Sequence, residues 1–128
     1  MADLEDVRRI GLSLPETTAD DRGFGVIVKG KVKGVAWTWM ERIDPKKPRV
    51  PRNDVVAVRT VDQEEKASLI AANPKVYFTE PHYNGFPAVL VRLEEIGVEE
   101  LEELLIDGWR CQAPKALVKQ YDSSQSNQ

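Results

Sequence analysis

Apolar residues recur at the three- and four-residue spacing of an amphipathic helix in two segments of the chain, residues 3–14 and residues 98–109. A third helix is predicted to begin at Asp62, a favourable N-cap residue that is followed three residues later by a glutamate. Residues 115–121 are predicted to form a last, short helical piece.

Short runs that are rich in β-branched and aromatic residues predict strands between these helices. Such runs cover residues 24–28, 32–40, 54–60 and 87–93. The run at 87–93 is largely apolar at both alternating sets of positions, which indicates an internal strand. The order of the elements predicts an α+β domain, in which helices pack against a largely antiparallel sheet.

The strand predicted at 32–40 carries two tryptophans, and strict alternation places Val35, Trp37 and Trp39 on one face. Two tryptophans on one face of a strand are typical of a hydrophobic core. The alternative is an aromatic platform on which the bases of a single-stranded nucleic acid stack, and three nearby lysines keep that alternative open.

The length of 128 residues and the content of 41% apolar and 30% charged residues are typical of one globular domain. We assign residues 1–121 to that domain and predict that residues 122–128 are a disordered polar tail. No apolar run reaches the roughly 20 residues that cross a bilayer, and the N-terminus lacks the features of a signal peptide. With the single cysteine, Cys111, these features predict a cytoplasmic protein, either a monomer or a homodimer.

The net charge of −3 conceals a basic middle third, because residues 29–59 carry nine basic and three acidic side chains. Within it, three prolines in residues 44–53 predict an exposed, semi-extended loop. The basic segment predicts contact with phosphate backbones or with an acidic partner, and the alternative is a solvated loop that balances the acidic helices. The candidate nucleic-acid-binding residues are Lys29, Lys31, Lys33, Lys46, Lys47, Arg49 and Arg52.

Motifs of catalysis and of cofactor binding are absent from the sequence. It has no P-loop, no dinucleotide-binding glycine motif and no nucleophile elbow. The sequence has one histidine and one cysteine, nearly thirty residues apart, and these are too few ligands to predict a metal site. We therefore predict no catalytic residues, no metal and no cofactor, and we interpret Cys111 as a partly buried helix residue.

His82 is the only histidine, and histidine is the residue type that can exchange a proton near neutral pH. It lies between Pro81 and an Asn-Gly turn signal, which predicts a rigid, sharply turned loop. His82 is interpreted either as a ligand contact or as a structural residue that holds the loop against the body. The candidate ligand-binding residues are His82, Tyr83, Asn84 and Arg110.

The stretch Phe-Thr-Glu-Pro-His-Tyr-Asn-Gly-Phe-Pro-Ala-Val-Leu-Val-Arg-Leu at residues 78–93 resembles the signature of the MmcQ/YjbR-like proteins. Similar matches occur in the same order at residues 7–15, 54–59 and 109–118. The resemblance implies a small α+β domain similar to the secretion-chaperone-like and frataxin-like folds, and it carries over no catalytic residues. Such proteins are often labelled DNA-binding because of a double-wing likeness in shape, which is an analogy at the level of the fold.

We therefore expect a non-enzymatic binding domain, and the first hypothesis is that its basic strand–loop region contacts DNA or RNA. The second hypothesis is a domain that binds a small molecule, a peptide or a protein in a pocket around His82.

Overall fold

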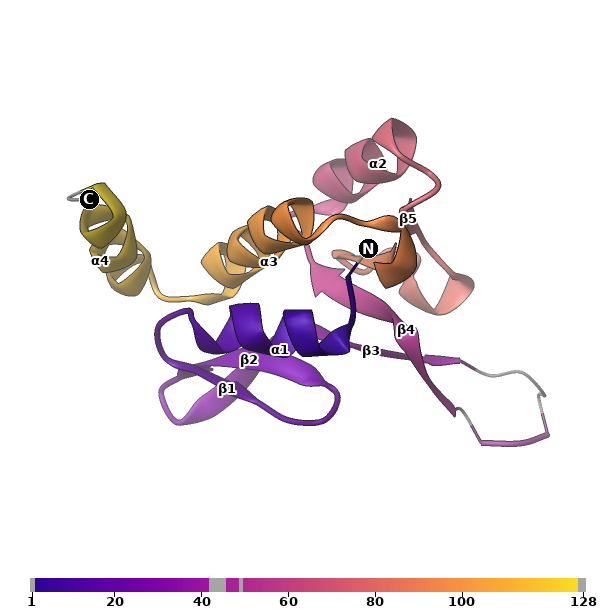
Figure 1. Ribbon diagram of the computed structural model, residues 1–128, viewed down its shortest axis with the longest axis horizontal. Helices are drawn as coiled ribbons and strands as arrows, with labels where there is room; N and C mark the ends of the chain where they lie inside the picture. Colours follow the sequence, from indigo (N-terminus) through magenta and orange to yellow (C-terminus); the bar gives the residue numbers. More distant parts are fainter. Residues whose placement is uncertain (1, 42–45, 49, 127–128) are drawn as a thin grey trace.

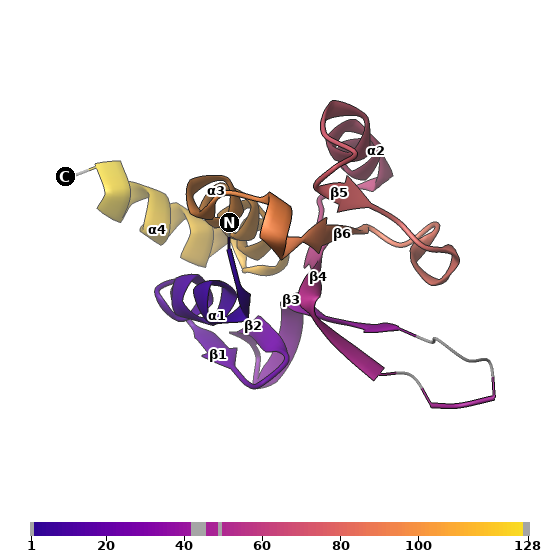
Figure 2. The same ribbon diagram turned by 45° about the vertical axis from the view of Figure 1, so that its right-hand side comes forward.

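The chain folds as a six-stranded antiparallel sheet with helices packed against it (Figure 1; Figure 2). The computed structural model describes residues 2–41, 46–48 and 50–126. The strands lie in the order β1-β2-β3-β4-β6-β5, so β6 is internal, as predicted. The α+β class predicted from the sequence is confirmed.

The helices are α1 (Leu4–Leu12), α2 (Gln63–Ala72), α3 (Val98–Gln112) and α4 (Lys115–Ser126), with 3-10 helices η1 (Pro81–Tyr83) and η2 (Leu93–Glu95). The strands are β1 (Thr17–Ala19), β2 (Gly23–Val28), β3 (Lys31–Glu41), β4 (Val50–Arg59), β5 (Tyr77–Phe78) and β6 (Ala88–Arg92). None of the helices in the described part of the chain has the length and apolar character needed to cross a bilayer.

The main hydrophobic core lies on the face of the sheet that α1 and α3 cover. Leu101, Leu105 and Trp109 of α3 are fully buried there against Val56 and Val58 of β4. These residues follow the three- and four-residue spacing that predicted this helix from the sequence. The buried stripe fixes the rotation of α3, and its C-terminal end therefore has a defined position beside β3.

The opposite face of the sheet, which we call the outer face, carries a second and smaller apolar cluster. It contains the buried Trp39, Val55, Tyr83 and Leu90, with the half-buried Trp37 packed against them. The loop that contains η1, rather than a long helix, supplies the covering residue Tyr83.

Two irregularities in β3 decide which side chains reach which face. The first lies opposite Phe24 and Gly25 and leaves Val35 without a cross-strand partner, which turns its side chain into the main core at 0% exposure. The prediction that Val35, Trp37 and Trp39 share one face is therefore wrong for Val35. The second irregularity lies between Thr38 and Trp39, where three successive residues of β4 have no partner in β3.

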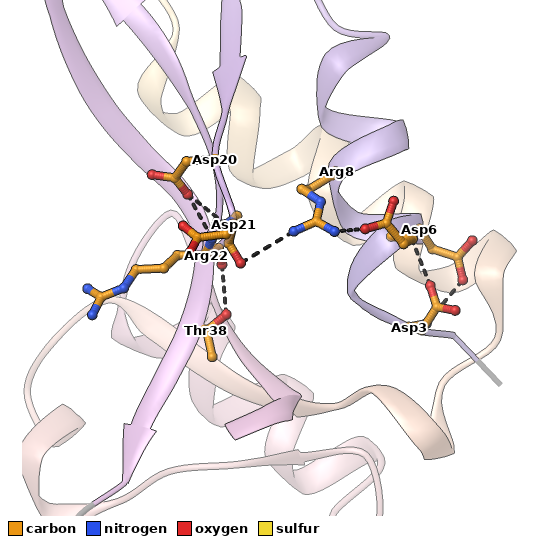
Figure 3. A network of polar contacts seen from close by, with 9 residues as sticks. Asp3, Asp6, Arg8, Asp20, Asp21, Arg22 and Thr38 are labelled. Atoms are coloured by element: carbon orange, nitrogen blue, oxygen red, sulfur yellow. Dashed lines mark hydrogen bonds and ion pairs between the residues drawn. The ribbon is translucent and has the colours of Figure 1, made fainter. Parts of the chain in front are cut away.

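A polar network ties α1 to the turn between β1 and β2 (Figure 3). The Arg8 guanidinium donates to the Asp21 carbonyl at 3.3 Å, and the Asp20 carboxylate accepts two backbone N–H groups of the turn at 2.8 and 3.1 Å. Thr38 of β3 donates its hydroxyl to the Arg22 carbonyl at 2.9 Å. The turn is thus held from the helix side and from the sheet side.

Three elements differ from the prediction. Strand β1 forms within a predicted polar connection, because its backbone pairs with β2 although its sequence has no apolar alternation. Strand β4 begins at Val50, so residues 50–52 pair with β3 instead of belonging to the predicted loop. Residues 44, 45 and 49 of that loop lie outside the described residues. Helix α4 continues to Ser126, so the first five residues of the predicted disordered tail are helical, and an ion pair joins Asp122 in this added part to Arg110 of α3.

Candidate functional site

The basic residues predicted to bind nucleic acid lie at the two ends of β3. Lys29 lies in the turn that precedes β3, and Lys31 and Lys33 lie at the start of the strand. The other described candidates, Lys46, Lys47 and Arg52, follow the opposite end of β3. An eleven-residue strand is about 33 Å long at roughly 3.3 Å per residue, so no small ligand can contact both groups at once. Arg49 lies outside the described residues.

The β2–β3 turn presents two of these lysines to the helix side of the sheet. Lys29 and Gly30 have φ values of 52° and 79°, as a two-residue type I′ hairpin turn requires. Lys33 pairs with the buried Val26, and cross-strand partners point to the same face of a sheet. Lys33 therefore points to the side of the sheet on which α3 lies.

A hollow of about 740 Å³ separates this turn from the junction of α3 and α4. Its apolar lining includes Val28, Ala113, Pro114 and Leu117. Its charged lining is Lys29, Lys33 and Lys115, with the carboxylate of Glu16.

A second hollow of about 420 Å³ shares two lining residues, Ala113 and Lys115, with the first. It adds Arg110, Lys119 and Asp122 to the charged groups. We call the two hollows together the basic groove.

Helix α4 forms one wall of the basic groove, and contacts with α3 hold it in place. The rings of Trp109 and Tyr121 meet edge to face with centroids 5.1 Å apart. The Arg110 guanidinium pairs with both oxygens of the Asp122 carboxylate at 2.8 and 2.9 Å and lies over the Tyr121 ring. Pro114 separates the two helices, since it cannot continue α3.

The net charge of the basic groove comes from its lysines, since Asp122 neutralises Arg110. Lys29, Lys33, Lys115 and Lys119 form no ion pair with any described residue, and Glu16 is the carboxylate that remains among the lining residues. The groove therefore has a local charge of about +3, in a chain whose net charge is −3.

Lys115 and Lys119 were not among the residues predicted from the sequence. They lie four residues apart at the start of α4, which places them on one face of the helix. That spacing is visible in the sequence, but the sequence does not reveal that the helix lies beside the β2–β3 turn.

The hairpin formed by β3 and β4 carries the other predicted basic residues. Lys46 and Lys47 are exposed near its tip. The Arg52 guanidinium pairs with the Asp54 carboxylate through Nε and Nη2 at 2.9 and 2.8 Å and lies over the Trp39 ring. This bidentate pair lowers the pKa of Asp54 and neutralises the charge of Arg52.

Hydrogen bonds that do not involve the side chain of His82 tie its loop to the rest of the domain. The buried Lys66 donates to the carbonyls of Tyr83 and Phe86 at 2.5 and 3.0 Å. The Tyr83 hydroxyl accepts from Trp37 Nε1 at 3.1 Å. His82 itself is exposed, and its ring contacts Tyr83 edge on.

The four predicted ligand-binding residues do not form one pocket. Tyr83 belongs to the apolar cluster of the outer face, and His82 and Asn84 flank it in the same loop. Arg110 lies at the end of α3, the helix that covers the opposite face. The sheet therefore separates Arg110 from the other three residues.

The described residues offer no metal site and no activated thiol. They contain no group of three or more His, Cys, Asp or Glu side chains that could hold a metal ion. Cys111 lines the basic groove, but burial, together with the nearby carboxylate of Glu65, raises the pKa of its thiol. The protonated thiol donates to the Asp107 carbonyl at 3.2 Å, so it is a poor nucleophile.

Comparison with known proteins gives relatives without an assigned function. The chain is 55% identical over 71 residues to uncharacterized proteins of Mycobacterium tuberculosis (Rv2570 and MT2646) and Mycobacterium bovis (Mb2600). The match covers 56% of this chain and 55% of each relative, so the chain spans about half the length of the curated relatives it matches. No family model matches the chain.

The fold resembles that of a Deinococcus radiodurans protein, DR2400, whose crystal structure contains a DUF419 domain. The TM-score is 0.62 at 23% sequence identity, and the match covers 94% of this chain and 88% of that protein. At this identity the likeness concerns the fold alone, so the fold is that of a DUF419 domain.

Proposed function

We propose that this chain is a non-enzymatic, cytoplasmic member of the MmcQ/YjbR-like family that binds nucleic acid in the basic groove. The observation that carries the proposal is a groove lined by four lysines without ion-pair partners among the described residues. Unpaired lysines repel one another, and a ligand that supplies a row of negative charges removes that repulsion. Membership of the family is supported by the ordered motif matches and by the shared fold.

Contacts between lysines and phosphates predict how strongly the binding constant depends on salt concentration. Each lysine that meets a phosphate releases a condensed counterion, which gives a slope of log K against log salt of about −0.9 per contact on a duplex and −0.7 on a single strand. Four contacts therefore predict slopes of about −3.6 and −2.8, respectively. An enzyme-like pocket for a neutral ligand would show almost no slope.

The test is fluorescence anisotropy with labelled duplex DNA, single-stranded DNA and single-stranded RNA of mixed sequence, between about 50 and 200 mM salt. The groove variant is Lys33→Glu with Lys115→Glu, and its matched control is Lys46→Glu with Lys47→Glu at the hairpin tip, which changes the net charge by the same amount. We expect the groove variant to bind at least about tenfold more weakly and to lose roughly half the salt slope, with little change in the control. The proposal is wrong if no probe binds at about 50 mM salt, or if only the hairpin variant loses binding.

The apolar lining of the same groove favours a second candidate, an acidic peptide segment of a partner protein. Val28, Pro114 and Leu117 lie between the lysines and would contact apolar side chains of such a peptide. A peptide that displaces the nucleic acid, and binds more tightly than it, would identify the second candidate. Nucleic-acid binding that is insensitive to the peptide would support the first.

A further inference from the structure

A hollow on the outer face of the sheet combines charges of both signs with aromatic walls. It has a volume of about 300 Å³, which is enough room for an amino acid or a similar small metabolite. It lies where three successive residues of β4 leave the pairing with β3, beside the start of η2. Bulges of this kind often lie next to binding sites, because they change the direction in which side chains point.

Two of the four carboxylates that line the hollow are already neutralised. Asp54 pairs with Arg52 as described above, and Glu95 pairs with Lys75 at 3.4 Å. The carboxylates of Glu80 and Glu94 form no ion pair or hydrogen bond with a described residue. The hollow therefore contains two negative groups that are free to meet a ligand.

One positive group of the hollow also has no carboxylate partner among the described residues. The Arg92 guanidinium lies 4.0 Å above the centre of the Phe78 ring. Its Nη1 donates to the carbonyls of Pro74 and Lys75 at 3.2 and 3.3 Å, which fixes the side chain without using its charge. Its remaining N–H groups are available to a carboxylate.

The aromatic walls form a corner between these groups. The rings of Trp39 and Phe78 meet edge to face, with centroids 5.8 Å apart and planes inclined by 77°. An aliphatic chain that follows this corner is shielded from water on two sides.

We propose that the hollow binds a basic α-amino acid, such as arginine or lysine. Its two cationic groups meet Glu80 and Glu94, its carboxylate meets Arg92, and its aliphatic stem lies along Trp39 and Phe78. This ligand matches the count of unpaired charges, two negative and one positive. A neutral zwitterion leaves one of these groups unmatched, and a simple amine leaves two. The site lies on the opposite face from the basic groove and does not depend on nucleic-acid binding.

The first experiment compares four ligands by titration in ¹H–¹⁵N NMR spectra, with the indole N–H signals included. L-Arginine and L-lysine are expected to shift the signals of the hollow. L-Citrulline, which lacks the side-chain charge, and agmatine, which lacks the carboxylate, are each expected to bind at least about threefold more weakly. Absence of binding by arginine and lysine at about 20 mM overturns the proposal, as does equal binding of all four ligands.

The second experiment assigns the binding to the hollow. Glu80→Gln and Glu94→Gln are each expected to weaken arginine binding by about threefold to tenfold, while Glu103→Gln, an exposed residue of α3, leaves it unchanged. Neither of the replaced carboxylates pairs with a described residue, so neither variant is expected to alter the fold. Equal weakening by Glu103→Gln would mean that arginine binds through the general acidity of the chain, and the proposal would then be wrong.

Discussion

Lys66 ties the loop that carries His82 to helix α2, and replacing it by methionine tests how the loop is held. The side chain is 4% exposed, and its ammonium group donates to the carbonyls of Tyr83 and Phe86 at 2.5 and 3.0 Å. No carboxylate within ion-pair distance balances its charge among the described residues. Lys66→Met keeps most of the apolar stem and removes both hydrogen bonds.

The size of the effect follows from the two carbonyls that lose their donor. Leaving a buried acceptor unsatisfied costs about 1–3 kcal/mol, and the Phe86 carbonyl is only partly buried, so the loss is about 2–4 kcal/mol. Removal of the buried ammonium offsets about 1 kcal/mol of this loss of stability, because the charge no longer has to be desolvated. We expect the free energy of unfolding to fall by about 1–3 kcal/mol, which lowers Tm by about 3–15 °C for a domain of this size.

The pH dependence gives the prediction a second, independent readout. Burial lowers the pKa of Lys66, so between that value and the unfolded value of about 10.4 the unfolded state binds more protons than the folded state. The stability of the wild type relative to Lys66→Met must therefore rise as the pH increases through this window. The neutral amine still donates two hydrogen bonds, so the loop remains held at high pH.

The assay is urea unfolding followed by tryptophan fluorescence, at pH 7 and at about pH 9.5. Lys75→Met is the matched control, because Lys75 is exposed and forms a surface ion pair with Glu95, and its effect should stay within about 0.5 kcal/mol. A Lys66→Met variant as stable as the wild type would refute the reasoning. So would a stability difference that shrinks as the pH rises.

Three further substitutions have defined expected outcomes. Tyr77→Phe removes the 2.6 Å hydrogen bond to Glu100 and should lower the unfolding free energy by about 0.5–1.5 kcal/mol in urea denaturation. Lys29→Asn relieves the cost of a positive φ and should stabilise the domain by about 0.5–1 kcal/mol in the same assay, yet reduce the salt slope of nucleic-acid binding by about one contact. Trp109→Phe leaves the Pro15 carbonyl without its 3.1 Å donor and opens a cavity in the core, so we expect a loss of about 2–3 kcal/mol by calorimetry.

Local patterns in the sequence predicted the elements well wherever one periodicity holds without interruption. The face of α3 that carries Leu101, Leu105 and Trp109 is the face that the structure buries. The pattern failed at Val35, because an irregular pairing reverses alternation and depends on the register with β2 rather than on residues within β3. Strand β1 was missed for a related reason, since its backbone pairing with β2 needs no apolar alternation.

The candidate site was less predictable than the fold, because it depends on distances between elements. The sequence places Lys29 and Lys47 in one basic segment, but a strand of eleven residues separates them in space. Lys115 is 82 positions beyond Lys33 in the sequence, yet both line one hollow. Counting charges along the chain therefore identified Lys29 and Lys33 of the basic groove, but it grouped them with the lysines of the β3–β4 hairpin instead of with Lys115 and Lys119.

Helix α3 explains how a chain of net negative charge keeps a basic site. Four of its five acidic residues lie in its first half, between Glu99 and Glu103, whereas the basic groove begins at Arg110 near the other end of the helix. At 1.5 Å per residue, Glu103 lies about 13 Å from the end of the helix, which exceeds the Debye length of about 8 Å at physiological salt. The glutamates thus weaken the potential of the groove only slightly, while they favour the positive N-terminal end of the helix dipole. The same end adjoins η2, which carries Glu94 to the outer-face hollow, so one helix separates an acidic end suited to cations from a basic end suited to anions.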